Sequence, residues 1–289
     1  MKFLPSLIGV IHSLTNDEIA AFGCRQGSYS QYHEGDGGTE NDIAYQLNGF
    51  AGCHPGQARP CVRHQLKCQM NIAQDSRTLT ITTNGIPDHN AWSLEPNAEL
   101  RGLEVKFRVP KVPQLQSGQV KPVNDGAVGF AINGVDIYGG TSVDTCCDFI
   151  TDYYDKIDYC TGYATPTQPA YGRYHYHFYP ASVHGYQGCP VAQCGPDTAS
   201  QLVGVAKDGF PIYGPVQWYS PSLNKIYSSN PGNNCRDCKL TQISSGMLDQ
   251  CNGIEVADGS SSDGSNYRYI MTGQFPYTLQ AAGIISNFI

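Results

Sequence analysis

The sequence predicts a mainly β protein, rich in disulfides, in which two tandem pseudo-repeated β units form a sandwich or barrel-like body. Three observations lead to this prediction: the composition, the number of cysteines and an internal repeat. Only 15% of the 289 residues are charged, whereas Gly (32), Tyr (19) and Pro (18) are plentiful. Such a composition favours short strands joined by many turns, and a hydrophobic content of 40% is enough for a sizeable core.

The cysteines indicate an oxidising compartment. Twelve is too many for a reduced cytosolic domain that does not bind metal, so disulfides and secretion are predicted. One local bond, Cys189–Cys194, is expected. The alternative for another group is a zinc site made by Cys235, Cys238 and Cys251, although no suitably spaced fourth ligand follows. The cysteines are Cys24, Cys53, Cys61, Cys68, Cys146, Cys147, Cys160, Cys189, Cys194, Cys235, Cys238 and Cys251.

The N-terminal region reads as a leader followed by a loop-rich segment. Lys2 precedes a short apolar run, and Ala20-Ala21 offers small residues for cleavage, so residues 1–21 are a possible signal peptide; a buried first strand is the alternative. Residues 22–77 are rich in Gly, Cys and polar residues. No later run approaches the ~20 apolar residues of a membrane helix. A net charge of −7 without a basic cluster argues against a nucleic-acid partner.

The domain that follows is expected over residues 78–289 and opens with a strand. Residues 78–83 alternate polar and apolar, as a half-buried strand does, and Asn84-Gly85 is typical of a hairpin turn. The turn is followed by Asp88-His89. An imidazole beside a carboxylate can serve acid/base chemistry, and an ordinary surface turn is the alternative interpretation.

An internal repeat organises the rest of the chain. Residues 127–139 align without gaps on residues 202–214 with seven identities, and each copy reads as strand, Asn-Gly or Asp-Gly turn, strand. In both copies a D-x-C-x-G motif and then a Y-x-Y motif follow, so two units, 127–177 and 202–270, are predicted to superpose. Gly134 and Gly209 should occupy the turns with positive φ.

The first Y-x-Y motif holds the candidate site. Alternation along a strand places His175 and His177 on one face and the tyrosines Tyr174 and Tyr176 on the other. Neutral imidazole is a common metal ligand, so this pair predicts half of a copper or zinc site, or an acid/base pair; two hydrogen-bonded structural histidines are the alternative. His89 is the predicted third ligand.

Several motifs together resemble the YHYH-domain family over about residues 78–280. They are Thr83-Asn84-Gly85-Ile86-Pro87-Asp88-His89, Tyr174-His175-Tyr176-His177, Asp208-Gly209-Phe210-Pro211-Ile212-Tyr213-Gly214-Pro215, Leu248-Asp249-Gln250-Cys251-Asn252-Gly253 and Phe275-Pro276-Tyr277-Thr278-Leu279. The resemblance implies an extracellular location and a shared fold more than a chemistry.

The chain also departs from the family pattern, in which a histidine follows each D-x-C-x-G and a second Y-H-Y-H lies near the C-terminus. Here Tyr163 and Ile254 occupy the positions of the histidines that follow D-x-C-x-G, and Tyr267-Arg268-Tyr269-Ile270 replaces the second Y-H-Y-H. Two interpretations follow: a site like that of the family survives in the first half only, or the protein has kept the scaffold for another use.

Two classes of function follow. The first is a secreted binding or structural protein that holds a metal ion or small ligand, or contacts the extracellular matrix. The second is an extracellular enzyme of unknown substrate, either metal-assisted or using His89, Asp88 and Asp208 with the histidine pair as acid/base groups. Asp208 has a second interpretation, because Asp is favoured in such turns in its own right.

Overall fold

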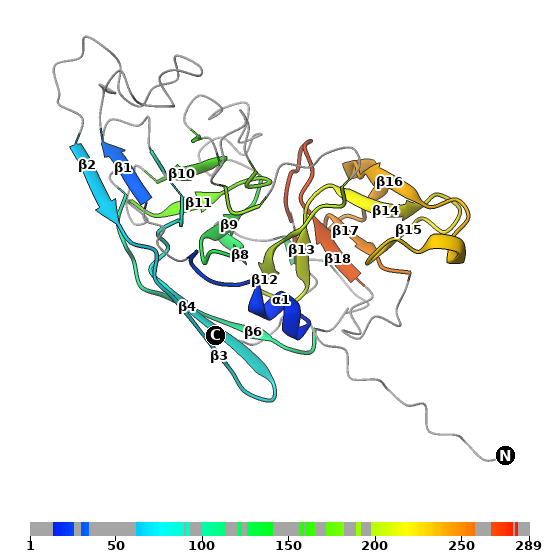
Figure 1. Cartoon of the computed structure of the whole chain (residues 1–289), viewed down its shortest axis with the longest axis horizontal. Coiled ribbons are helices and arrows are strands. Elements are labelled where there is room, and N and C mark those ends of the chain that lie inside the picture. Colours follow the sequence, from blue (N-terminus) through cyan, green and yellow to red (C-terminus); the bar gives the residue numbers. More distant parts are fainter. Residues whose placement is uncertain are drawn as a thin grey trace, which may run out of the picture.

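The structure of the protein is a computed structural model. It describes residues 14–25, 30–34, 62–89, 91–92, 100–113, 121–122, 126–140, 157–158, 160–165, 172–181, 189–191, 198–257, 267–279 and 281–282. The predicted mainly β class is confirmed: across these ranges the chain forms nineteen strands and one short α-helix, α1 (Asn16–Ala20) (Figure 1).

An eight-stranded sheet forms the centre of the molecule. Its strand order is β10-β11-β9-β8-β12-β13-β18-β17, and β8 and β12 pair antiparallel in the middle. The strands are β8 (Ala127–Ala131), β9 (Asp136–Tyr138), β10 (Gly162–Ala164), β11 (Tyr174–Tyr176), β12 (Leu202–Ala206), β13 (Pro211–Tyr213), β17 (Gly253–Glu255) and β18 (Tyr267–Ile270).

Each half of this sheet runs outward through the same series of pairings. An antiparallel hairpin comes first (β8 with β9, β12 with β13), then a parallel neighbour (β11, β18), then an antiparallel edge strand (β10, β17). The superposition of residues 127–177 on 202–270 stays a prediction. The barrel-like alternative is wrong for the described strands, because the sheet begins at β10 and ends at β17 and does not close.

Smaller sheets flank the central one (Figure 1). Their strands, in spatial order, are β3 (Met70–Gln74), β4 (Thr78–Thr83) and β6 (Val105–Pro110); β15 (Lys225–Tyr227), β14 (Val216–Ser220) and β16 (Lys239–Gln242); β2 (Val62–Leu66), β1 (Ser30–Glu34) and β5 (Ala91–Trp92); and β19 (Ala281–Ala282) with β7 (Lys121–Pro122). Two 3-10 turns, η2 (Gly232–Asn234) and η3 (Ser245–Met247), border β16.

The predicted strand at residues 78–83 is β4, and its burial alternates as expected. Gly85 has a φ of +67°, which confirms a turn at Asn84-Gly85. The turn does not close a hairpin, however, because β4 pairs with the preceding β3 and with β6. The chain leaves the sheet after Gly85 and carries Asp88 and His89 toward the central sheet.

The turns of both repeated hairpins are as predicted. Gly134 and Gly209 have φ values of +78° and +95°, a region that residues with a β-carbon rarely adopt. In each turn the glycine N–H donates to the carbonyl of the last residue of the first strand, Ala131 or Ala206.

Three hydrophobic clusters hold the body together. The largest lies on the tyrosine-bearing face of the central sheet, the second lies between that sheet and β4, and the third packs β14 and β15 against the β17–β18 edge. Leu14 and Phe22, which flank α1, belong to the second cluster. Glu18 of α1 accepts a hydrogen bond of 2.6 Å from the Tyr213 hydroxyl, so residues 14–21, which belong to the predicted signal peptide, pack against the body. Residues 1–13 lie outside the described part.

Six of the seven described cysteines form disulfides: Cys24–Cys68, Cys160–Cys189 and Cys235–Cys238. The predicted Cys189–Cys194 bond is wrong, because Cys189 pairs with Cys160 of the D-x-C-x-G motif. Cys251, at the equivalent place in the second half, is a buried free thiol. The remaining cysteines lie outside the described residues.

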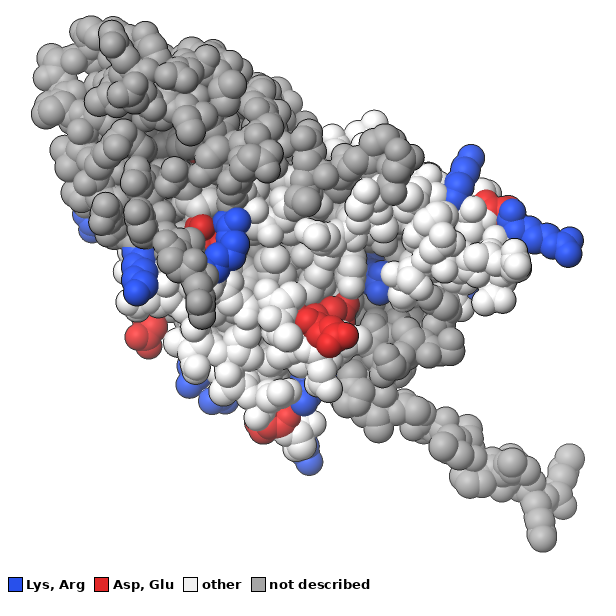
Figure 2. All heavy atoms as spheres, viewed as in Figure 1, with Lys and Arg blue, Asp and Glu red and all other residues white. Residues whose placement is uncertain are grey.

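None of the described helices has the length and hydrophobicity needed to cross a membrane. Figure 2 shows Lys and Arg side chains spread singly over the coloured part of this face, without a basic patch there.

Candidate functional site

His175 and His177 meet on one face of the central sheet. The Nε2 atoms of the two rings lie 3.0 Å apart, and the side chains are buried, with 3% and 4% of their surface exposed. Alternation along β11 places Tyr174 and Tyr176 on the opposite face, where their rings pack edge to face at 5.5 Å. The predicted division of this strand into a histidine face and a tyrosine face is confirmed.

The other ring nitrogens lie beside backbone carbonyls. His175 Nδ1 lies 3.1 Å from the Arg173 carbonyl, and His177 Nδ1 lies 2.5 Å from the Gly139 carbonyl, while the Thr165 hydroxyl lies 3.5 Å from His175 Nδ1. A carbonyl oxygen accepts hydrogen bonds only, so these contacts favour the tautomers with the proton on Nδ1. In those tautomers both Nε2 atoms present lone pairs toward the same point; with one proton on Nε2 instead, the two rings share a hydrogen bond of 3.0 Å. Donation of the Nδ1–H to a backbone carbonyl is the usual support of a histidine that binds metal through Nε2.

Aromatic rings enclose the pair. Tyr138 stacks on His175 with ring centroids 4.1 Å apart and meets His177 edge on at 5.8 Å, while Tyr163 packs edge on against His175. Burial lowers the pKa of His175 to about 4, against the opposing effect of the Arg173 carbonyl. Burial and then the neighbouring His175 hold the pKa of His177 well below its usual range. Both imidazole rings are therefore uncharged near neutral pH, the form that binds metal ions.

An ion pair lies beside His175. Asp136, directly opposite His175 on β9, accepts a short hydrogen bond from Arg173 Nε. Burial raises the pKa of the Asp136 carboxyl, and the hydrogen bond and charge of Arg173 oppose this rise.

His89 does not join the other two histidines. Its Nε2 lies 2.8 Å from the Tyr176 hydroxyl, and its ring packs edge on against Tyr174, so it lies on the tyrosine face of β11. Among the described residues, no three His, Cys, Asp or Glu side chains that include a histidine have ligand atoms within 4.8 Å of one another. The predicted convergence of His89 with His175 and His177 is therefore wrong. Strand β11 lies between His89 on its tyrosine face and the pair His175 and His177 on its other face.

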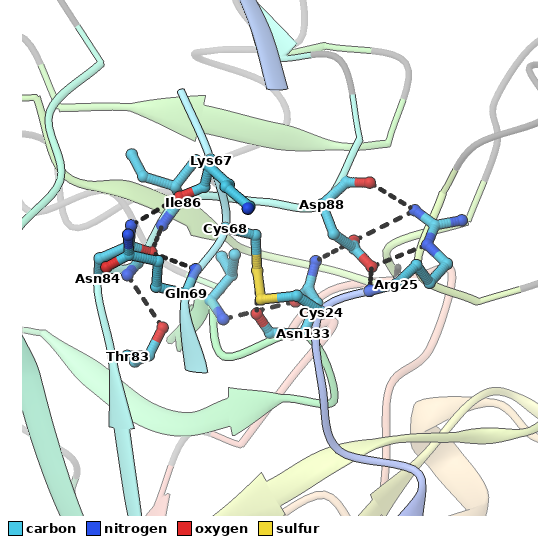
Figure 3. The surroundings of a disulfide bond; sticks show 12 residues. Cys24, Arg25, Lys67, Cys68, Gln69, Thr83, Asn84, Ile86, Asp88 and Asn133 are labelled. Atoms are coloured by element: carbon cyan, nitrogen blue, oxygen red, sulfur yellow. Dashed lines mark hydrogen bonds and ion pairs between the residues drawn. A yellow bond between two sulfur atoms is a disulfide. The ribbon is translucent and has the colours of Figure 1, made fainter. Parts of the chain in front are cut away.

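Asp88 is also held in a structural network on the tyrosine face (Figure 3). Arg25 Nε donates to its Oδ2 at 2.8 Å and Arg25 Nη2 to its Oδ1 at 3.1 Å, while Asn133 Nδ2 donates to the same Oδ1 at 3.1 Å. Asn133 Nδ2 also lies 3.0 Å from the Tyr176 hydroxyl. Burial acts to raise the pKa of Asp88, but the hydrogen bonds from Arg25 and Asn133 and the charge of Arg25 outweigh it, so the pKa is lowered.

Asp208 is aligned with Asn133 and likewise bonds the second tyrosine of its Y-x-Y motif. Its Oδ2 accepts a hydrogen bond of 2.5 Å from the Tyr269 hydroxyl, and its Oδ1 accepts one of 3.3 Å from the Phe210 N–H. The second contact is that of an Asp in its own turn. The geometry supports the turn interpretation of Asp208, which lies on the face away from Arg268 and Ile270.

The D-x-C-x-G motifs make the same contacts twice. Asp158 Oδ1 accepts from the N–H groups of Cys160 and Gly162 at 2.9 and 3.0 Å, and Asp249 Oδ1 accepts from Cys251 and Gly253 at 2.8 and 2.9 Å. The second oxygen of each aspartate accepts the hydroxyl of the first motif tyrosine, Tyr174 or Tyr267. The motif thus anchors the edge strand of each half to the Y-x-Y strand.

A second group could offer metal ligands on a loop. Cys235, Asp237 and Cys238 have ligand atoms within 4.8 Å of one another. The two sulfurs are joined in a disulfide, so they provide no thiolate in this state. Cys251 lies in the main core, and the zinc site of Cys235, Cys238 and Cys251 is not formed.

Two partners of the histidine face were not identified from the sequence. The Gly139 carbonyl and the Tyr138 ring come from the end of the first repeated hairpin, whose Ile-Tyr-Gly sequence is also present in the second copy. Their role depends on the parallel pairing of β9 with β11, which the sequence alone does not specify.

The profile of the family described as YHYH protein matches residues 106–283, more than half of the chain. No curated protein matches the chain. No solved structure matches it either.

Proposed function

The chain belongs to the YHYH protein family, and from this membership and the histidine pair we propose that it is a disulfide-stabilised extracellular protein that binds copper through His175 and His177. One observation carries the proposal: the two Nε2 atoms converge at 3.0 Å while each Nδ1 lies beside a backbone carbonyl. When both Nδ1 atoms carry the protons, two Nε2 lone pairs face each other at this distance and repel each other. A cation bound by both atoms removes the repulsion.

The separation favours copper over zinc. A metal about 2.05 Å from each Nε2 would form an N–metal–N angle of about 94° at the observed 3.0 Å separation. Square-planar copper(II) places neighbouring ligands near 90°. A tetrahedral zinc ion would need the nitrogens about 3.3 Å apart. Copper(II) also binds nitrogen donors most tightly of the first-row divalent ions.

The pair supplies two coordination positions, and the described residues offer no third His, Cys, Asp or Glu ligand next to it. A small ligand or matrix group with an oxygen or nitrogen donor is the partner that such an ion would recruit. The three disulfides support an extracellular location, since such bonds persist in oxidising compartments.

The alternative, an extracellular enzyme with His89, Asp88 and Asp208 as acid/base groups, has less support. All three side chains are themselves buried and hydrogen-bonded: His89 to Tyr176, Asp88 to the exposed Arg25 and to Asn133, and Asp208 to Tyr269. A general acid or base must reach the reacting group of the substrate.

Metal analysis of the purified protein and titration of the metal-free protein with copper(II) test the proposal. We expect one copper per chain and an electron paramagnetic resonance spectrum with splitting from two nitrogens. His175→Gln or His177→Gln should weaken binding more than about a hundredfold, because loss of an outer-shell partner alone costs 10–100-fold. His89→Gln is the matched control and should keep the binding of the unmodified protein.

A folded His175→Gln, His177→Gln double variant that still binds copper with the original affinity would refute the proposal. Binding lost in His89→Gln but kept in the double variant would move the site to the tyrosine face. Circular dichroism of each variant shows whether it is folded.

A further inference from the structure

Arg268 occupies, in the second half of the sheet, the place that His175 has in the first. It is the residue between the two tyrosines of β18, as His175 is between those of β11, and each strand has a parallel neighbour on one side and an antiparallel edge strand on the other. Tyr138 stacks on His175, and its aligned residue Tyr213 lies under the Arg268 guanidinium, 4.0 Å from the central carbon to the ring centroid.

The Arg268 side chain is buried and has no acidic partner among the residues that the structure describes. It is 3% exposed, and a guanidinium has five N–H donors to satisfy. Nη2 donates to the Ser228 hydroxyl at 3.1 Å, and Nε is buried without a hydrogen-bond partner. None of the ion pairs among the described residues includes Arg268.

The neighbours of Arg268 across and along the strand are uncharged, and the Glu18 carboxylate, which accepts from the hydroxyl of Tyr213, forms no ion pair with Arg268. Ile254, directly opposite Arg268 on β17, and Ile270, two residues along the same face, belong to the third hydrophobic cluster. In the first half, Asp136 on β9 supplies a carboxylate at this level of the sheet, and it pairs with Arg173. The aligned residue in the second half is Pro211, which has none.

Such a group is costly to bury. An unpaired buried charge destabilises a protein strongly, and one tyrosine ring with one neutral hydroxyl offsets only part of the cost. The Arg268 Nε–H has no partner and each terminal nitrogen carries two N–H groups, so the guanidinium can offer two donors to the oxygens of a carboxylate, phosphate or sulfate group while Nη2 keeps its bond to Ser228. We infer that Arg268 is the centre of a binding site for a small oxyanion, with Tyr213 as the aromatic platform beneath it.

This site is independent of copper binding by the histidine pair, and together the two halves would hold ions of opposite sign at equivalent positions. The test uses the full chain, stripped of metal on a chelating resin. Thermal unfolding and isothermal titration are measured with sodium phosphate and sodium acetate against sodium chloride at equal ionic strength.

We expect a saturable isotherm in the titration, and a melting temperature that rises with the logarithm of the anion concentration above Kd, by about 4 °C at a hundred times Kd. Arg268→Met should lose this rise and should be at least as stable as the unmodified protein without the anion, because an apolar chain replaces an unpaired charge. Arg268→Lys keeps the charge but not the paired donors, and should bind at least tenfold more weakly. Arg108→Met, an exposed arginine of β6, is the control and should respond as the unmodified protein does.

General salt effects give no saturable isotherm in the titration, and they shift the melting temperature equally in all variants. The inference is overturned if the unmodified protein shows no saturable response, or if Arg268→Met keeps the response. It is also overturned if Arg268→Met is destabilised by several degrees without the anion, because Tyr213 and Ser228 would then already compensate the charge. Loss of copper binding with an intact anion response, or the reverse, separates the two proposals.

Discussion

Gly162→Ala tests how the D-x-C-x-G motif holds the Y-x-Y strand. A β-carbon at Gly162 would lie 1.8 Å from the Tyr174 hydroxyl oxygen, far inside any real contact, so the tyrosine must move. Overpacking of this kind costs about 1–3 kcal/mol. The displaced hydroxyl also leaves buried Asp158, and loss of a hydrogen bond to such a group costs about 1.5–3 kcal/mol. We expect Gly162→Ala to lower the free energy of unfolding by about 3–5 kcal/mol.

Urea unfolding followed by circular dichroism measures this change. The matched control is Gly246→Ala in η3, where an added β-carbon meets no atom within 4 Å and the free energy should change by less than about 1 kcal/mol. In a double-mutant cycle, Gly162→Ala and Tyr174→Phe together should cost less than the sum of the two single changes, because both lose the same hydrogen bond to Asp158; the ring carbons of residue 174 still meet the added β-carbon. A cost below about 1 kcal/mol, or a Tyr174→Phe change that simply adds to the first, would contradict this explanation of the motif.

The other predictions concern three buried groups, Asp208, Cys251 and Asp88. Asp208→Asn should cost about 1–2 kcal/mol in urea unfolding through the weakened Tyr269 contact, and it should leave the copper affinity unchanged; a lost affinity would point to a functional carboxylate. Burial raises the pKa of the Cys251 thiol to about 11, so iodoacetamide at pH 8 should label Cys251 only after unfolding, as peptide mass spectrometry would detect; rapid native labelling would contradict its burial. The folded-state pKa of Asp88 is lowered, so its contribution to stability is complete above its unfolded pKa of about 4 and is lost as pH falls below that value. Asp88→Asn should therefore flatten the acid side of the stability profile, and an unchanged slope would contradict the Arg25 contact.

Local features of the sequence predicted local structure well. The alternation at residues 78–83 gave the bounds of β4, and the Asn-Gly and Asp-Gly pairs gave the turns at Gly134 and Gly209, because both signals depend on neighbouring residues. The histidine and tyrosine faces of β11 followed from the same alternation. The pairing of cysteines did not follow, because Cys160 and Cys189 are brought together by contacts between distant segments.

The placement of His89 shows the limit of this reasoning. The prediction relied on the similarity of Asn84-Gly85 to the turns of the repeat, but β4 takes both of its partners from other segments. Which side of the central sheet receives residues 86–89 is decided by those partners. A turn type specifies the local chain direction and carries no information about the face that the next residues will contact.

The tyrosines of the two Y-x-Y motifs limit where polar side chains can lie, and this limit could have been deduced from the sequence. A buried hydroxyl needs a hydrogen-bond partner, and the two Y-x-Y strands bury four of them. Each finds a polar side chain: Tyr174 with Asp158, Tyr176 with His89 and Asn133, Tyr267 with Asp249, and Tyr269 with Asp208.

Two of the five candidate site residues, His89 and Asp208, are thus direct partners of tyrosines, and Asp88 holds the Asn133 that bonds Tyr176. What remains is the face that carries no tyrosine hydroxyls from these strands, with His175 and His177 in one half and Arg268 in the other. Polar groups on that face are not needed to satisfy the Y-x-Y tyrosines. The ring nitrogens of the histidine pair contact each other and backbone carbonyls, whereas Arg268 Nε has no partner, and the two ions proposed above would complete the coordination of these groups.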